Sequence, residues 1–427
     1  MSLLRKSLIL LLMCVAFAAS AQITQHSFSL NEAVVFALEN NKMLKTSGKD
    51  IEVANKQRWQ AISAGLPQIS ASLDYTTMFN YKLEIMGMPI SMKDQSNIAG
   101  NLQQLIFSGQ YIQGILLSNL SKQISEQAYA MTELDIKENV ANAYYLTLIT
   151  EESKSIVELN LKDLEIVLEH TQSMYEVGMA EITDVDQLRV TVSQLKNALS
   201  TLKNTISLNY NLLRFHLGVD AGDEIVLTDN LDYFLGQQLY TLLMDESFDV
   251  LNNIQYQIME TQEKLSQKNV GMQKWAFAPS IVGVYSYTEK FLKPELDMSP
   301  NQMLNFTMSI PVLSSWDRMS KVGQAKIELE KTQLNKELLE DQLYLQENQL
   351  RSDLQNAIDN YLLQKENVEV AQRVFQNYKN KYEYGILSSL ELTQANSNYL
   401  TAQTNYLESA MALLQAQLKL QKLFNTL

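Results

Sequence analysis

Few of the side chains that usually carry chemistry occur in this sequence, and those present show no catalytic arrangement. The three histidines, His26, His170 and His216, are scattered along the chain without the spacing of a metal site. The sequence contains neither a glycine-rich phosphate-binding loop nor a nucleophile elbow. We therefore expect a protein that is not an enzyme and that holds no cofactor or metal.

Methionines supply the remaining candidate for metal binding. Met86, Met88 and Met92 lie within residues 81–95, which we expect to form a loop between two strands. Thioether sulfur is a ligand for Cu(I), so a copper site is one interpretation. The other is that these side chains only make apolar contacts, because the loop has no histidine.

The N-terminus has the layout of a secretory signal peptide. Arg5 and Lys6 precede an apolar run at residues 8–18, and small residues then lead to a predicted cleavage after Ala21. The run is too short for a transmembrane anchor. The only cysteine, Cys14, lies within it, so the mature chain has no thiol for a disulfide or a metal.

Charge and hydropathy exclude two further classes of protein. The chain has 48 acidic and 34 basic residues, a net charge of −14, and such a chain repels nucleic acid. After the signal, no apolar stretch approaches the roughly 20 residues of a membrane helix. A membrane-spanning part would have to consist of strands.

Proline placement and heptads predict very long helices. There is no proline between Pro89 and Pro279 or after Pro311, and proline is what would interrupt a helix. Apolar residues in 184–213 alternate steps of three and four, as a coiled-coil seam requires; they are Val185, Leu188, Val192, Leu195, Leu199, Leu202, Ile206 and Leu213. A helix over 109–177 would be about 100 Å long.

The chain also contains an internal repeat. Residues 40–76 correspond to 252–288, and Tyr175-Glu176-Val177-Gly178 corresponds to Tyr382-Glu383-Tyr384-Gly385. Each repeat is predicted to contain a helix, two strands, a long helix, a glycine turn and a helix. We place the first repeat at 22–218, with strands at about 67–79 and 97–107, and a linker or equatorial segment at 219–246. The second repeat follows at 247–427, with strands at about 279–291 and 302–312.

The predicted strands have one apolar and one polar face. Leu304, Phe306 and Met308 alternate with Asn305 and Thr307. A two-layer soluble sheet would show the same alternation. Four strands are too few for such a core, however, and the adjoining helices would have no sheet to cover. Strands that face lipid on one side and water on the other explain the pattern better.

In combination, these features resemble the TolC family of outer-membrane efflux proteins over nearly all of the mature chain. The motifs that carry the resemblance occur twice and in the same order. They are Leu66-Pro67-Gln68 and Ala278-Pro279-Ser280 before strands, Leu105-Ile106-Phe107-Ser108-Gly109 and Ile310-Pro311-Val312-Leu313 after strands, Val177-Gly178-Met179 and Tyr384-Gly385-Ile386 at helical turns, and Leu217-Gly218 at the end of the first repeat.

The resemblance implies a mainly α fold with a membrane β-barrel portion. Three chains would form a homotrimer in which each contributes four strands to a 12-stranded barrel in the outer-membrane lipid. The helices would form a coiled-coil tunnel in the periplasm. The trimer would be a passive exit duct of a tripartite efflux or type I secretion system, joined through a periplasmic adaptor (membrane fusion) protein to an inner-membrane transporter. Residues 81–95 would then be extracellular.

The resemblance also implies roles for particular residues. The adaptor-docking tip falls on Val177, Gly178 and Met179 and on Tyr384, Gly385 and Ile386. Residues of the periplasmic entrance, or gate, fall on Asp184, Tyr382, Glu391 and Gln394. The chain departs from the family pattern at Gln394, which replaces an acid, and at Leu387, which replaces an arginine. Closure must therefore depend on other contacts, and three copies of Glu391 around one axis would attract cations.

Alternatives for Glu391 and for the whole chain remain open. Glu391 could simply be a solvated acid on a helix face. The chain could be a periplasmic coiled-coil scaffold or adaptor without a pore. An adaptor needs compact β domains besides a hairpin, whereas this chain has two strand pairs in a duplicated helical layout, which favours the duct.

Overall fold

The structure is a computed structural model that describes residues 25–79, 81–85, 88–91, 93–236, 243–244, 246–292, 297 and 299–427. The predicted signal peptide (1–21), Met86 and Met92 lie outside the described residues, as does the side chain of Met88. The chain divides into two compact units. Unit 1 comprises Met1–Thr46, Met131–Asn253 and Gln342–Leu427, and unit 2 comprises Ser47–Ala130 and Ile254–Asp341.

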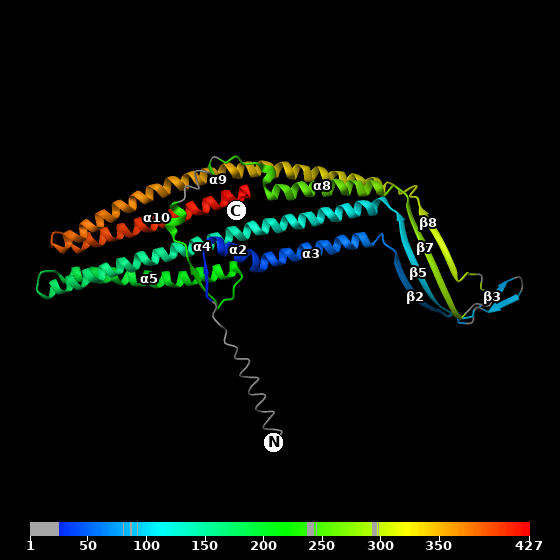
Figure 1. The fold of residues 1–427 in the computed structure, drawn as a ribbon, viewed down its shortest axis with the longest axis horizontal. Coiled ribbons are helices and arrows are strands. Elements are labelled where there is room, and N and C mark those ends of the chain that lie inside the picture. Colours follow the sequence, from blue (N-terminus) through cyan, green and yellow to red (C-terminus); the bar gives the residue numbers. More distant parts are fainter. Residues whose placement is uncertain are drawn as a thin grey trace, which may run out of the picture. The chain divides into compact units, whose positions relative to one another are not determined.

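Unit 2 contains an antiparallel sheet of four strands in the order β2-β5-β7-β8 (Figure 1). The strands are β2 (Gln68–Thr76), β5 (Gln95–Phe107), β7 (Ser280–Leu292) and β8 (Gln302–Ser309). Each repeat supplies two of them, and β5 pairs with β7 across the repeats. Among the described residues, β2 and β8 each have a strand neighbour on one side only.

The register of these strands separates apolar from polar side chains. Leu73 lies opposite Ile98, and Phe306 lies opposite Gly283. On the other face, Asn101 lies between Ser70 and Ser286, and the Ser286 hydroxyl donates a hydrogen bond to Asn101. The apolar face is open: Ile69, Leu73 and Phe306 are 82%, 72% and 64% exposed.

Helices α3 (Lys42–Ser63) and α8 (Ile254–Trp275) lead into β2 and β7, and the two longest helices leave the sheet. Helix α4 (Gly109–Glu176) has 68 residues and α9 (Asp317–Glu383) has 67. Within unit 2, α8 and α9 are joined by a buried Ser266–Thr332 hydroxyl contact of 3.2 Å and by a Lys336–Glu263 ion pair of 2.5 Å. The uninterrupted length of α4 and α9 agrees with the absence of proline from both.

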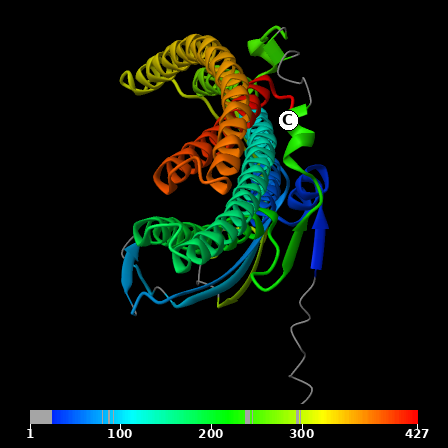
Figure 2. The same ribbon diagram turned by 90° about the vertical axis from the view of Figure 1, so that its left-hand side faces the viewer.

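Unit 1 contains the distal parts of α4 and α9 with α5 (Ile182–Leu217) and α10 (Ser389–Phe424), which return beside them as two helical hairpins. The turns of both hairpins face the viewer in Figure 2. Unit 1 also contains a short helix α2 (Leu30–Asn40), a helix α6 (Leu231–Gly236) and a parallel pair of strands, β1 (Gln25–Phe28) with β6 (Glu224–Leu227).

Three parts of the fold add to the sequence-based expectation. The segment 219–246, predicted as a linker or equatorial segment, contains β6 and α6, and β6 pairs with a strand 199 residues earlier in the chain. The segment 81–95 contains a hairpin, β3 (Lys82–Ile85) with β4 (Met88–Ser91), rather than a plain loop. The two compact units cut across both sequence repeats. None of the helices in the part of the chain that the structure describes is long and apolar enough to cross a membrane.

Candidate functional site

The two helical turns have the same backbone geometry. At the first, the N–H groups of Gly178 and Met179 donate to the carbonyls of Tyr175 and Met174. At the second, those of Gly385 and Ile386 donate to the carbonyls of Tyr382 and Lys381. This is the Schellman pattern, in which the residue after the helix is left-handed. Gly178 and Gly385 accordingly have φ values of +77° and +69°, which glycine adopts without strain.

Each turn presents apolar side chains to solvent. Val177 and Met179 are 70% and 75% exposed, and Tyr384 and Ile386 are 81% and 72% exposed. Apolar side chains that cluster on a surface mark a contact site more often than isolated ones do. The six residues predicted to form a docking tip thus form two exposed turns, one in each repeat.

A capping interaction begins the helix after each turn. Glu391 accepts hydrogen bonds from the N–H and the hydroxyl of Ser388, at 3.0 and 2.8 Å, while its own N–H donates to the Ser388 hydroxyl. Asp184 is the third residue of α5, as Glu391 is of α10, and accepts from the N–H of Glu181 at 3.3 Å. The contacts with Ser388 hold the pKa of Glu391 below its ordinary value of 4.5.

Asp184 also links the two repeats. The hydroxyl of Ser389, a residue only 4% exposed, donates a hydrogen bond to its Oδ1. Ser389 lies on α10, so this contact joins the start of one hairpin's second helix to that of the other. Sequence reasoning assigned Asp184 to closure but did not identify Ser389.

Tyr382 makes a second contact between the repeats. Its hydroxyl lies 2.7 Å from the Thr171 hydroxyl of α4, and both side chains are buried. Burial raises the pKa of Tyr382, and the Asp184 carboxylate adds to this shift. Asp184 and Tyr382 thus each bond to a residue of the opposite repeat.

Leu387 occupies the position where the family pattern has an arginine. It packs against an apolar cluster that draws from all four helices of the hairpins: Val167, Leu188, Phe375, Tyr382, Leu392 and Ala395. An apolar contact therefore stands where a charged side chain was expected, and the two hairpins pack together through it.

Two further polar contacts lie deeper between the repeats. The Asn160 amide donates to Asn396 Oδ1 at 2.6 Å in the interior, and Lys379 pairs with Asp163 at 3.0 Å. Asn160 lies four residues before the buried Leu164, and Asn396 lies four residues after the buried Leu392. A polar residue at helical spacing from buried leucines was the signal that could have found them.

Gln394, the last residue predicted for the gate, stays exposed on α10. Its amide donates to Asn398 Oδ1 on the same helix, at 3.0 Å. The structure thus places Asp184 and Tyr382 at the contact between the repeats, and Glu391 and Gln394 on the exposed surface of α10.

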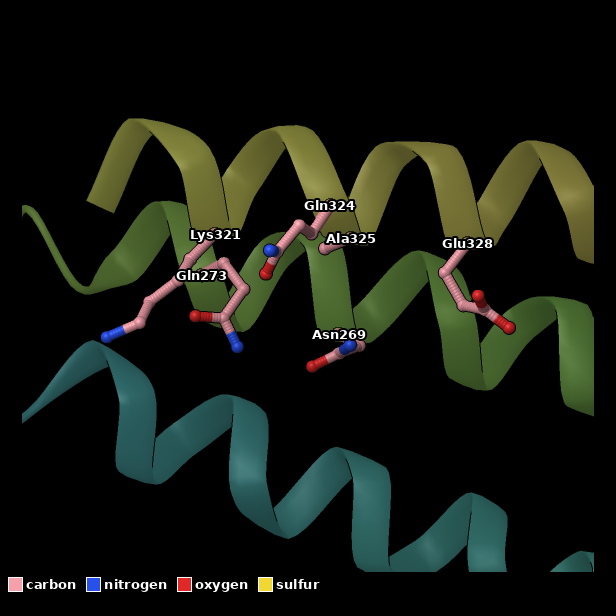
Figure 3. Close-up of a pocket in the computed structure, with 6 residues that line it drawn as sticks. All are labelled: Asn269, Gln273, Lys321, Gln324, Ala325 and Glu328. Carbon is pink, nitrogen blue, oxygen red and sulfur yellow. The ribbon is translucent and has the colours of Figure 1, made fainter. Parts of the chain in front are cut away.

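Unit 2 contains a polar groove of about 450 Å³ between α8 and α9. Figure 3 shows side chains that line it: Asn269, Gln273, Lys321, Gln324, Ala325 and Glu328. Both charged side chains already form ion pairs, Lys321 with Asp317 and Glu328 with Lys331. Across the described ranges, no group of three or more His, Cys, Asp or Glu side chains could hold a metal ion. The groove is a hydrophilic helix surface.

A duplicated strand pair joined to long paired helices defines a class of membrane-channel fold, and comparison with known proteins identifies the family. Residues 34–219 and 251–426 match the model of the outer membrane efflux protein family. The chain belongs to this family. Membership confirms the resemblance seen in the sequence, an outer-membrane location and a class of protein that is not an enzyme.

Relatives agree with this assignment. The chain is 23% identical over 305 residues to a probable efflux pump outer membrane protein, TtgC of Pseudomonas putida, covering 70% of this chain and 62% of TtgC. It is 25% identical over 150 residues to the outer membrane protein TolC of Salmonella enteritidis, covering 35% of this chain and 30% of TolC. The chain thus spans less than two thirds of either relative.

The fold matches a solved channel structure. The outer membrane channel CmeC of Campylobacter jejuni superposes with a TM-score of 0.76 at 17% sequence identity, covering 93% of this chain and 85% of CmeC. The predicted mainly α fold with a duplicated helix–strand unit is therefore confirmed.

Proposed function

We propose that three copies of this chain form a passive exit duct in the outer membrane, which exports small molecules or proteins as part of a tripartite efflux or type I secretion system. The four-stranded sheet is the observation that carries the proposal. Its apolar face is exposed, its opposite face is polar, and within the described part of the chain each edge strand has a partner on one side only. Pairing of β2 with β8 of a neighbouring copy would close a 12-stranded barrel with lipid outside and water inside.

The long helix pairs supply the other half of the duct. Helices of 68 and 67 residues exceed what a globular domain needs and suit a tunnel through the periplasm. TtgC, a relative, is a probable efflux pump outer membrane protein. A passive duct of this kind works with an inner-membrane transporter through a periplasmic adaptor.

The exposed turns are the proposed docking surface for the adaptor, and the residues beside them are the proposed gate. Val177, Met179, Tyr384 and Ile386 offer apolar contacts to a partner. Closure of the entrance depends on the two hairpins staying together. The hydroxyl contact of Tyr382 with Thr171 and that of Ser389 with Asp184 hold them.

Planar-bilayer conductance of residues 22–427 tests the duct. We expect small, long-lived, cation-selective openings. In Tyr382→Phe with Ser389→Ala, which loses both hydroxyl contacts at about 1 kcal/mol each, the open state should become several-fold more populated. Tyr406→Phe is the matched control, because the Tyr406 hydroxyl contacts Tyr361 of the same repeat.

Silence from both the unaltered trimer and the opened variant would overturn the channel. A protein that is soluble without detergent would do the same. A pore-free coiled-coil scaffold would then be the better description of this chain.

A further inference from the structure

A pair of buried amides lies in the contact between the two repeats, farther from the turns than the hydroxyl contacts of the proposed gate. Asn160 of α4 and Asn396 of α10 are 5% and 1% exposed. The Asn160 amide donates a hydrogen bond to Asn396 Oδ1, and the two atoms are 2.6 Å apart. Both residues belong to unit 1, so the contact lies within one compact part of the chain.

This contact satisfies only part of the hydrogen-bonding capacity of the two amides. Asn160 Oδ1 and Asn396 Nδ2 are also buried, and neither has a hydrogen-bond partner among the described residues. Turning both amides over would exchange the roles of the two residues and leave the same deficit, one acceptor and one donor group. A buried polar group without a partner destabilises the packing that buries it, because it has given up its hydrogen bonds to water.

The side chains next to the amide pair are apolar. On α10, Asn396 lies between Leu392 and Leu400, one helical turn away on either side. Leu392 belongs to the cluster that draws from all four helices of the hairpins. Leu400 packs against a second cluster, which consists of Leu161, Leu164, Val192 and Leu195. The amides therefore interrupt a contact that is otherwise largely apolar, and aliphatic neighbours cannot supply the missing hydrogen bonds.

Another buried asparagine of unit 1 differs in this respect. Asn209 of α5 is 7% exposed, and its amide donates to the Thr150 hydroxyl of α4 at 2.9 Å. Thr150 in turn donates to the carbonyl of Leu146. In the described chain, no atom of Asn209 is both buried and without a partner. The deficit thus belongs to the contact between the hairpins, and this asparagine within one hairpin does not share it.

We propose that the Asn160–Asn396 pair is a conformational device that favours opening of the periplasmic entrance. The inference rests on the proposed gate, in which the entrance is closed while the two hairpins stay together. Separation of the hairpins would expose both amides to water, which would supply the missing donor and acceptor. The hydroxyl contacts of Tyr382 and Ser389 favour the closed state and the amide pair opposes them, so a docking partner needs a smaller preference for the open state to open the entrance.

Single-channel recordings of residues 22–427 measure the open probability. Asn160→Leu with Asn396→Leu removes both unpaired groups and makes the contact apolar throughout, so the open probability should fall at least about five-fold. Each single substitution leaves the other amide without a partner and should raise the open probability instead. A pair that simply held the hairpins together would raise it in all three variants.

Hydrogen exchange separates this inference from the proposed duct, because it requires no current. Peptides 157–168 and 389–403 should exchange at least about five-fold more slowly in the double variant than in the unaltered protein. Slower exchange in a protein that never conducts would overturn the duct and leave the effect of the amide pair on the hairpins standing.

Asn209→Leu with Thr150→Val is the matched control. It also replaces a buried amide and its partner by apolar side chains, but within one hairpin. The open probability and the exchange of peptide 389–403 should therefore stay unchanged. If two leucines prevent assembly, Asn160→Ala with Asn396→Leu carries the test, because this combination is closer in volume to the original pair.

Three results would overturn the proposal. A double variant that opens more often than the unaltered protein would show that the amide pair holds the hairpins together. Unchanged open probability and unchanged exchange in the double variant would show that the two amides carry no deficit while the hairpins are in contact. An equal response of the control variant would assign the change to the general stability of the helices.

Discussion

Asp184 and Glu391 occupy the same position in the two repeats, the third residue of the helix after each turn, but their contacts differ. Glu391 accepts both of its hydrogen bonds from Ser388, the residue that caps its own helix. Asp184 accepts one from its own turn and one from Ser389 of the other repeat. The repeat thus contains an acid at the same position twice, and in the described chain Asp184 is the one that accepts a hydrogen bond from the other repeat.

The capping role of Glu391 can be separated from its charge. Glutamine can occupy the third position of a capping box as glutamate does, so Glu391→Gln should leave the turn folded while removing three charges from the trimer. We expect weaker block of the pore by divalent cations in single-channel recordings. Gln394→Glu is the matched opposite, because it adds an exposed acid one helical turn further on, and it should strengthen block.

The pH dependence of this block follows from the same contacts. Ser388 holds the pKa of Glu391 below 4.5, so the carboxylate stays charged at pH values above that and is neutralised as the pH falls through its lowered pKa. Cation block should therefore persist at pH 4.5 and be lost only at lower pH, where the carboxylate becomes protonated. Block that is equal in Glu391→Gln and the unaltered protein at neutral pH would remove this residue from the entrance.

The site could be predicted from the sequence only in part. Gly178 and Gly385 were recognisable because a tight helical turn needs a positive φ, and both have one. The partners Thr171 and Ser389 were not, because a hydroxyl gives no periodic signal and its partner lies about 200 residues away along the chain. At Leu387, where the family pattern has an arginine, the structure has an apolar contact with the cluster between the hairpins.

At the scale of elements, the repeat explains most of the fold. Heptad spacing and the absence of proline predicted the long helices, and alternating apolar and polar residues predicted the strands. The β1–β6 pair had no such signal, because two four-residue strands are too short for a period to be read. Their parallel pairing depends on tertiary contacts in unit 1, including the Tyr144 hydroxyl, which donates to the carbonyl of Phe28.

At Gly178 and Gly385, a residue that disfavours the left-handed backbone conformation should destabilise the turn. Gly178→Ala or Gly385→Ala should destabilise its turn by about 1–2 kcal/mol, and the cost is one of backbone alone, since an added Cβ would meet nothing within 4 Å at either position. Hydrogen exchange of the turn peptides measures the effect. Gly323→Ala is the control: it lies within α9, also in open space, and should stabilise by up to about 1 kcal/mol.

Equal exchange at the turns of Gly178→Ala and of the unaltered protein would contradict the Schellman geometry. Asparagine, which enters the left-handed region more easily than alanine does, should give an intermediate result.

At the scale of the whole molecule, the sheet is the part whose apolar face and strand edges a single chain leaves without partners. Its apolar side chains are exposed on one face, and its edge strands lack one neighbour within the described chain. A soluble protein would cover such a face with helices. Here the helices continue from the strand ends instead. In the proposed duct, lipid would cover the apolar face, and further copies of the chain would pair with the edge strands.

Two neighbouring residues of β2 test which face meets lipid. Leu73 lies opposite Ile98 on the apolar face, and Ser72 lies opposite Ala99 on the polar face. Arginine on the lipid face near the bilayer centre costs about 2–4 kcal/mol. A trimer would carry this cost once in each of its three chains. We therefore expect Leu73→Arg to reduce the yield of heat-resistant trimer in outer-membrane fractions severely.

Ser72→Arg adds the same side chain one residue away and should assemble normally, because its guanidinium would lie in the water-filled interior. It should instead lower cation selectivity in bilayer recordings, since three positive charges would line the lumen. If both variants assemble equally well, the apolar face does not meet lipid; if only Ser72→Arg fails, the sheet is inserted with the opposite face outward. Assembly of Ser72→Arg with loss of Leu73→Arg is the outcome that a barrel of three copies requires.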